Sequence, residues 1–139
     1  MKVFFDNCTS PVLATTLDGY IRHEGHSAYH IKDVADLPNG RHSSDEQWLR
    51  LMKSSPEVWM IVTGDGRILR NAALRAAIRA AKLHGIVMAP AYQKTQLHQV
   101  ASVLIWKWPE LLQVSEMIAP PNVHELSMNC ATKLKSLPL

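Results

Sequence analysis

The stretch Met1-Lys-Val-Phe-Phe-Asp-Asn-Cys8 decides the fold of this chain. Its apolar core, Val3-Phe-Phe5, is short, continuous and β-prone, which is typical of a strand buried on both faces of a parallel sheet. The run ends abruptly on Asp6 and Asn7. Open α/β sheets bind their ligands in the crevice outside the carboxyl ends of the strands. We therefore expect Asp6 to lie at a functional site.

A second stretch repeats this design, because Val58-Trp-Met-Ile-Val-Thr63 is a buried-strand pattern that ends at Gly64-Asp65-Gly66. The remaining pattern predicts strands over residues 27–34 and 86–90 and helices over 10–24, 43–54, 68–83 and 95–106. Ser44-x-x-Gln47 matches the capping box of a helix start. Gly25 and Gly85 are expected to end helices, and Pro109 to interrupt the last one.

The alternation of strands and helices predicts an α/β fold. We expect a three-layer α/β/α sandwich around a central, mostly parallel sheet of four to five strands. Pro120-Pro121 marks a boundary, so residues 1–118 are expected to form the domain. Residues 119–139 are weakly patterned and are expected to be a C-terminal extension, either an interface or a flexible segment.

Composition limits the class of protein. The chain has 139 residues, 47% hydrophobic and 19% charged, as expected for one globular domain. No apolar run approaches the ~20 residues of a membrane span, and the N-terminus does not resemble a signal peptide. The two cysteines do not form a disulfide framework, so a cytoplasmic protein with free thiols is expected. The net charge of +3 permits a nucleic-acid partner.

The two strand ends are expected to form one site. A strand order of 2-1-3-4 places the first and third strands side by side, about 4.8 Å apart. Asp6 and Asp65 would then lie close together, and two close carboxylates repel unless they share a proton or bind a cation. Hard divalent cations prefer oxygen ligands, so Mg²⁺ or Mn²⁺ is the expected cofactor.

A third acid is expected from the helix that begins after Ser44. Asp45 and Glu46 occupy its first turn and could reach the same sheet edge. Acids at this position also complement the helix dipole without any other role. The sequence leaves open which of the two is a metal ligand.

These motifs resemble a known family. Phe4-Phe-Asp-Asn7, Ser44-Asp-Glu46 and Ile61-Val-Thr-Gly-Asp65 together resemble a PIN-like domain over roughly residues 1–115. The chain is similar to VapC-type toxins and to short PIN-like relatives with a Ser-Asp-Glu helix start. The resemblance implies a metal-dependent endoribonuclease, the toxin of a type II toxin–antitoxin pair, silenced by an antitoxin protein encoded beside it.

The resemblance also implies residue roles. The catalytic acids would be Asp6, Asp45, Glu46 and Asp65, of which Asp6, Asp45 and Asp65 would hold the metal. Thr63 matches the small polar residue beside the last acid. Relatives often carry another acid two residues after the equivalent of Asp65, but Arg67 stands there. This chain is therefore expected to hold one metal where others hold two, or to use Asn7 as a neutral ligand.

The expected chemistry is hydrolysis of RNA by a metal-activated water. Asp6 or Asp65 could accept the proton of this water. Substrate contacts are expected from Asn7, Thr63, Arg67 and Arg70. Arg75, Arg79 and Lys82 share one helix face, which is either a phosphate-binding stripe or simply a solvated surface.

Two other classes of function remain open. The first is a non-catalytic interaction module on the same fold. The second is a receiver-like signalling domain, which would also bind Mg²⁺ at a strand end but would need an adjacent acid pair, and Asp6-Asn7 supplies one acid. Expected partners are RNA, an antitoxin and a second copy of the chain. Cys8 is expected to be a buried thiol.

Overall fold

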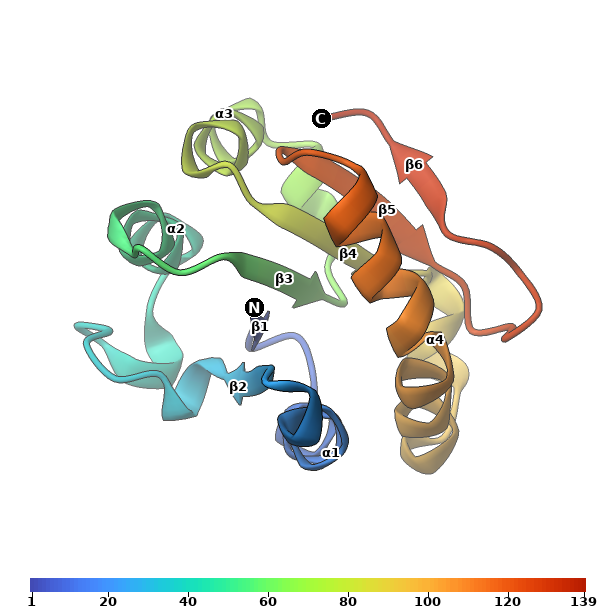
Figure 1. Ribbon diagram of the computed structural model, residues 1–139. Helices are drawn as coiled ribbons and strands as arrows, with labels where there is room; N and C mark the ends of the chain where they lie inside the picture. The colour runs from blue at the N-terminus through green and yellow to red at the C-terminus, as the bar shows by residue number, and fades with distance from the viewer.

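A six-stranded sheet forms the middle layer of the molecule (Figure 1). The computed structural model describes residues 1–139. The strands lie in the order β2-β1-β3-β4-β5-β6. Their bounds are β1 Lys2–Phe5, β2 Ser27–His30, β3 Trp59–Thr63, β4 His84–Met88, β5 Asn122–Leu126 and β6 Lys135–Leu137. The first five strands in this order are parallel, and β6 runs antiparallel to β5.

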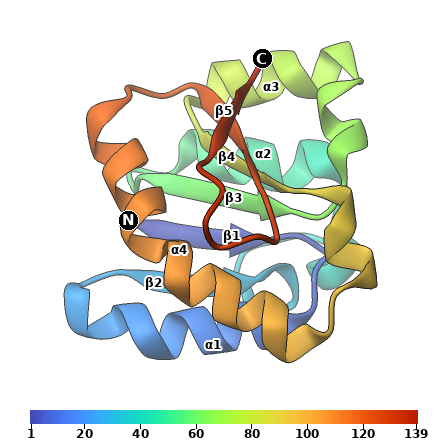
Figure 2. The same cartoon turned by 90° about the vertical axis from the view of Figure 1, so that its right-hand side faces the viewer.

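Four helices cover the two faces of the sheet (Figures 1 and 2). They are α1 Pro11–Ile21, α2 Asp45–Ser54, α3 Ala72–Ala81 and α4 Leu97–Met117. Five short 3₁₀ helices complete the structure: η1 Arg22–Glu24, η2 Ile31–Asp33, η3 Gly40–His42, η4 Gly66–Leu69 and η5 Pro90–Lys94. None of the helices has the length and apolar character that a membrane crossing requires.

Two hydrophobic cores confirm the three-layer sandwich. Successive residues of a strand point to opposite faces. Phe5 and Val62 accordingly pack in the core beneath α1 and α4, whereas Phe4 and Ile61 pack in the core beneath α2 and α3. Both faces of β1 and β3 are therefore buried, as their continuous apolar runs indicate.

The strand order 2-1-3-4 is confirmed, but the sheet has six strands where four to five were expected. Residues 119–139, expected as an extension, supply β5 and β6. Val123 and Leu126 of β5 are buried in the two cores. His124 and Glu125 interrupt the apolar run of β5, which hides the strand from sequence patterns.

Several element boundaries differ from expectation. β2 ends at His30, and a 3₁₀ turn replaces its expected second half. Asn71 caps α3, so the helix begins later than expected, and Lys82 ends it in a left-handed conformation with φ of 50°. Gly85 lies inside β4 instead of ending a helix. A Cβ atom there would lie 2.8 Å from Cγ2 of Val123, so the close packing of β4 on β5 requires glycine.

Pro109 does not interrupt α4, which continues for 21 residues to Met117. Proline removes one hydrogen bond to the carbonyl four residues earlier, which costs least where water can replace it. Pro109 is exposed, whereas its neighbours Trp108 and Leu111 are buried in the core. Burial of one helix face therefore outweighs the local effect of proline.

Candidate active site at the carboxyl edge of the sheet

Asp6 follows the last residue of β1 and is buried, with 6% of its surface exposed. Thr63 Oγ1 donates a hydrogen bond to its Oδ2. The backbone N–H of Cys8 donates to its Oδ1 at 3.1 Å. Burial, with a smaller contribution from the negative charges of Asp45 and Asp65, raises the pKa of Asp6 to about 6 against the effect of these two hydrogen bonds. Asp6 is therefore the most deeply placed acid of a cluster.

Thr63 links the ends of β1 and β3. Its hydroxyl donates to Asp6 and accepts the backbone N–H of Asp65 at 2.9 Å. The side chain is only 2% exposed. Thr63 therefore positions the two acids, in place of the substrate contact that the sequence suggests.

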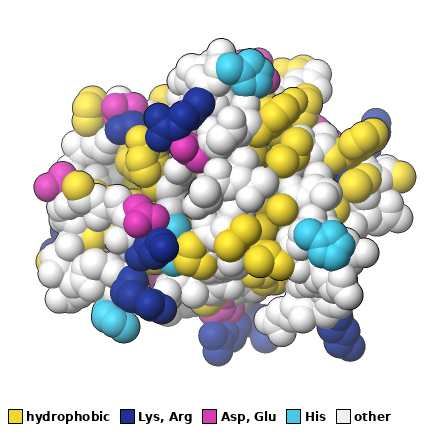
Figure 3. Space-filling view, turned by 90° about the horizontal axis from the view of Figure 1, so that it is seen from below, with side chains coloured by type: hydrophobic (Ala, Val, Ile, Leu, Met, Phe, Trp, Pro, Cys, Tyr) yellow, Lys and Arg dark blue, Asp and Glu magenta, His cyan; other side chains and the backbone are white.

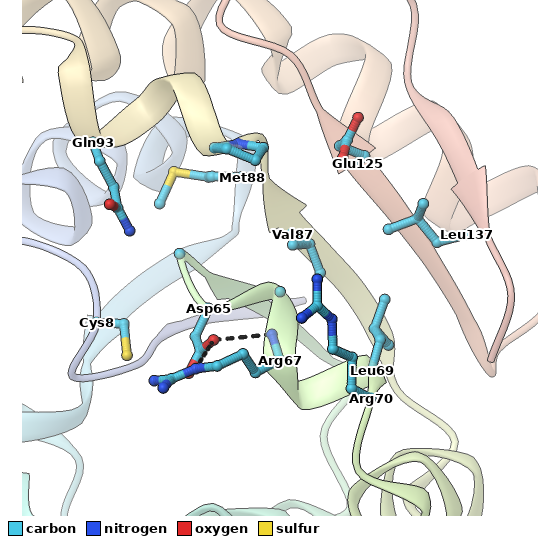
Figure 4. Close-up of a pocket in the computed structure, with 13 residues that line it drawn as sticks. Cys8, Asp65, Arg67, Leu69, Arg70, Val87, Met88, Gln93, Glu125 and Leu137 are labelled. Carbon is cyan, nitrogen blue, oxygen red and sulfur yellow. Dashed lines mark hydrogen bonds and ion pairs between the residues drawn. The ribbon is translucent and has the colours of Figure 1, made fainter.

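Asp65 forms a bidentate ion pair with Arg67 (Figure 4). Arg67 Nε lies 2.9 Å from Oδ1, and Nη2 lies 2.8 Å from Oδ2. The backbone N–H of Arg67 also donates to Oδ1 at 2.9 Å. The hydrogen bonds from the guanidinium are the main reason that the pKa of Asp65 lies below its usual value. Both oxygens of this carboxylate are thus occupied by a cation from the chain itself.

Asp45, at the start of α2, is half-buried and is held by an aromatic side chain. Trp48 Nε1, one helical turn later, donates to its Oδ1 at 3.1 Å. Burial is the main cause that raises the pKa of Asp45, and the charges of Glu46 and Asp65 add to it. Glu46 is exposed, and its side chain makes no hydrogen bond. Between the two candidates for the third acid, the structure therefore places Asp45 with Asp6 and Asp65.

A pocket of about 580 Å³ opens beside Asp65 at this sheet edge (Figure 4). Arg67 and Arg70 line it together with Val87 and Met88 of β4, as expected for a ligand site at strand ends. Figure 4 shows the Arg70 side chain directed into the pocket toward Val87. The fourth expected substrate contact, Asn7, is exposed in the turn after Asp6.

The first two thirds of the chain match a known protein family. The family model described as a PIN like domain matches residues 1–90. The chain belongs to the PIN-like domain family. No curated protein and no solved structure matches it. A PIN-like domain suggests a nuclease-type fold, since members are typically nucleases that bind divalent metals.

The matched region contains all three clustered acids of this PIN-like domain and the arginines beside them. It ends before α4, β5 and β6. Glu125 of β5 and Leu137 of β6 nevertheless line the pocket. The C-terminal part of the chain therefore contributes to the site.

The donor set of this PIN-like domain fits a divalent metal in its chemistry. Asp6, Asp45 and Asp65 offer carboxylate oxygens, which Mg²⁺ and Mn²⁺ prefer. In the structure, however, no three Asp, Glu, His or Cys side chains lie close enough together to hold a metal ion. The cation that close carboxylates require is supplied here in part by the chain itself, because Arg67 binds Asp65, while the hydroxyl of Thr63 binds Asp6.

Cys8 is exposed, contrary to the expected buried thiol, and lines the same pocket. Partial burial and the negative charges of Asp6 and Asp65 raise the pKa of this thiol to about 11. The raised pKa favours the protonated thiol near neutral pH, so this environment does not activate Cys8 as a nucleophile.

Gly64, at the bend that follows β3, is required by close packing. A Cβ atom there would lie 3.2 Å from the carbonyl oxygen of Cys8 and 3.2 Å from Cε1 of Tyr92. Glycine thus lets the turn after β1 and the 3₁₀ helix η5 approach the end of β3.

Sequence patterns missed Trp48, which holds Asp45, and several residues that line the pocket, among them Gln93, Glu125 and Leu137. Of these residues, only Trp48 could have been identified from the sequence, because it follows Asp45 by three positions in a predicted helix and therefore lies on the same face.

Proposed function

We propose that this PIN-like domain is a metal-dependent endoribonuclease that hydrolyses RNA phosphodiesters with Mg²⁺ or Mn²⁺. One observation carries the proposal. Asp6, Asp45 and Asp65 come from three separate segments of the chain, yet the charges of Asp45 and Asp65 both act on the buried carboxyl of Asp6. Perturbed carboxyl groups that gather at a strand edge beside a pocket are typical of catalytic sites.

Asp6, Asp45 and Asp65 are the residues that would hold the metal, and since they do not lie close enough together for this in the structure, their side chains would have to move together as it binds. When bound, the metal would neutralise phosphate charge and lower the pKa of a coordinated water. The chain's own residues supply the remaining functions. Thr63 and the Cys8 N–H orient the Asp6 carboxylate. Asp6 or Asp65 would accept the proton of the attacking water, and Arg67 and Arg70 would bind the phosphate.

The direct test is cleavage of labelled RNA with Mn²⁺, with Mg²⁺ and with chelator. We expect cleavage that requires metal and is lost in Asp6→Asn and Asp65→Asn. Asp33→Asn is the matched control, because Asp33 is an exposed acid in η2 outside the cluster. Cleavage that survives chelation, or full activity of Asp6→Asn, would overturn the proposal.

The resemblance to VapC-type toxins extends the proposal to a cytoplasmic toxin held by an antitoxin. The ion pair between Arg67 and Asp65 supports inhibition by an antitoxin, because an arginine of the antitoxin could bind a carboxylate of the site with the same bidentate geometry. A disordered antitoxin tail could fold onto the site as it binds. We expect growth arrest when the chain is expressed alone, and relief by the neighbouring gene product through a stable complex. Normal growth with soluble protein would contradict the toxin function.

Apolar side chains at the surface support contact with a protein partner, either the antitoxin or a second copy of the chain. Trp106 of α4 is 72% exposed, and Val12 and Tyr20 of α1 also reach solvent. Figure 3 shows hydrophobic side chains exposed among charged ones on the face seen from below. Measuring the mass of the protein in solution distinguishes a monomer from a homodimer.

A non-catalytic interaction module is the second candidate function. The observation that favours it is Arg67, which occupies both oxygens of Asp65 and stands where relatives often carry an acid. Such a module would bind RNA or protein without cleaving RNA at any Mn²⁺ concentration. The receiver-like alternative loses its support, because the chain belongs to the PIN-like family.

A further inference from the structure

Two neighbouring hollows lie between the acidic site and α3. The pocket beside Asp65 shares two lining residues, Leu69 and Leu137, with a second hollow of about 370 Å³. The second hollow is also lined by Arg75 and Arg79 of α3. We define the arginine groove as these two neighbouring hollows, whose lining includes four arginines and the apolar end of the chain: Arg67, Arg70, Arg75 and Arg79, and Leu137, Pro138 and Leu139.

The positive charge of this groove is not balanced by its own acids. Arg70, Arg75 and Arg79 form no ion pair with a carboxylate. The only acids that line the two hollows are Asp65 and Glu125. Uncompensated arginines along one groove create a positive potential that attracts a polyanion. Lys82, on the other hand, ends α3 and does not line the groove.

Two of the arginines have a position that contacts or charges define. Arg75 Nη1 donates to the carbonyl oxygen of Leu69 at 2.7 Å, which fixes its side chain between α3 and η4. The charge of Arg70 lowers the pKa of Asp65, so this arginine lies near the acidic site. The positive side of the groove therefore runs from the acids to the exposed surface of α3.

The opposite side is apolar and comes from the C-terminal strand. Figures 1 and 2 both show the end of the chain after β6 beside α3. Leu137 and Leu139 pack against the second core but remain partly exposed. Figure 4 shows Leu137 on the far side of the pocket from Asp65. A ligand in the groove would thus meet cations on one side and hydrocarbon on the other.

We propose that the arginine groove binds an extended single strand of nucleic acid, with phosphates on Arg70, Arg75 and Arg79 and bases against Leu137 and Leu139. A duplex hides its base faces in the stack, whereas a single strand exposes them to apolar side chains. The proposal deepens the ribonuclease function, since the groove would lead the strand to the acids. Binding itself does not require cleavage.

The test measures binding without catalysis, by fluorescence anisotropy of a labelled single-stranded RNA of about 12 nucleotides, the size range of such sites. Chelator is present throughout. We expect Arg70→Gln and Arg79→Gln each to weaken binding by on the order of tenfold and to reduce the slope of log affinity against log salt by about 0.7. Neither side chain makes a hydrogen bond that the fold would lose.

Arg50→Gln is the matched control, because Arg50 is an exposed, unpaired helix arginine on α2 outside both hollows. It should bind RNA as the wild type does. Asp6→Asn should also bind RNA in chelator although it cleaves none, which separates the groove from the chemistry. Duplex RNA of the same length should bind at least tenfold more weakly. The proposal is overturned if the wild type does not bind single strands, if duplex binds equally, or if Arg50→Gln weakens binding as much as Arg79→Gln.

Discussion

Arg67 places its Nε 2.9 Å from Oδ1 and its Nη2 2.8 Å from Oδ2 of Asp65, so one guanidinium spans both oxygens of the carboxylate. This fork geometry is the strongest way in which a side chain pairs with a carboxylate. A divalent metal on Asp65 would need the same oxygens. Arg67 and the metal are therefore expected to compete, and Arg67 becomes an internal substitute for a cation at this site.

Replacing Arg67 should strengthen metal binding. We expect Arg67→Gln to bind Mn²⁺ a few-fold more tightly than the wild type, because the Asp65 carboxylate becomes free. Isothermal titration calorimetry measures this without any need for activity. Arg50→Gln makes the same change of net charge away from the site and should leave the affinity unchanged. Weaker Mn²⁺ binding in Arg67→Gln would mean that the guanidinium does not compete with the metal.

Removing the hydroxyl of Thr63 should destabilise the fold and perturb Asp6. Thr63→Val leaves the N–H of Asp65 without its acceptor and Oδ2 of Asp6 without its donor, which should cost about 1–3 kcal/mol. The pKa of Asp6 should rise further, because the hydrogen bond from Thr63 lowers it. Urea unfolding and an NMR pH titration measure the two effects. Thr63→Ser, which keeps the hydroxyl, should resemble the wild type in both.

Asp45 and Glu46 should differ although they are neighbours. Asp45→Asn should raise the Mn²⁺ concentration required for half-maximal cleavage, and its amide oxygen can still accept from Trp48. Glu46→Gln should leave metal dependence unchanged and lose only the interaction with the helix dipole, about 0.3–1 kcal/mol. Titrating Mn²⁺ against both variants tests the assignment, and equal behaviour of the two would contradict it.

Three buried histidines should make stability fall on acidification. His30, His84 and His124 are 3%, 2% and 5% exposed, and Nδ1 of His124 has no hydrogen-bond partner. Burial is the main cause that lowers all three pKa values from 6.5. The unfolded chain then binds more protons than the native one below about pH 6.5, so the free energy of unfolding decreases as pH falls. Urea unfolding should show a shallower pH dependence in His124→Leu, and an unchanged slope would contradict this assignment.

The sequence was sufficient to predict the acidic edge because local patterns specify it. The apolar runs ending in Asp6 and Asp65 placed the two acids, and the capping box at Ser44 placed Asp45 in a first helical turn. The Arg67–Asp65 pair was not predicted, because a side chain two residues away can point in many directions.

The C-terminal strands were not predicted either, because the residues that bury them lie far away in the sequence. Val123 of β5 is buried only when β4 lies beside it, and Gly85 makes that approach possible. Pro109 predicted a break in α4, but burial of Trp108 and Leu111 on the opposite side maintains the helix. In these places tertiary packing overrides the local signal.

Neutralising Asp6 should separate catalysis from stability. The pKa of Asp6 is raised from 3.8 to about 6 in the folded protein, so its ionised form destabilises the fold near neutral pH by about 3 kcal/mol. The native state binds more protons than the unfolded state between these values, so this group adds stability as pH falls toward 4, opposite in sign to the histidines.

In metal-free buffer, Asp6→Asn should remove this contribution and approach or exceed the stability of the wild type at pH above 7. The same variant should lose RNA cleavage. Urea unfolding at several pH values, beside a cleavage assay with Mn²⁺, measures both. A wild-type pH slope in Asp6→Asn would mean that this carboxyl is not the group that titrates near 6.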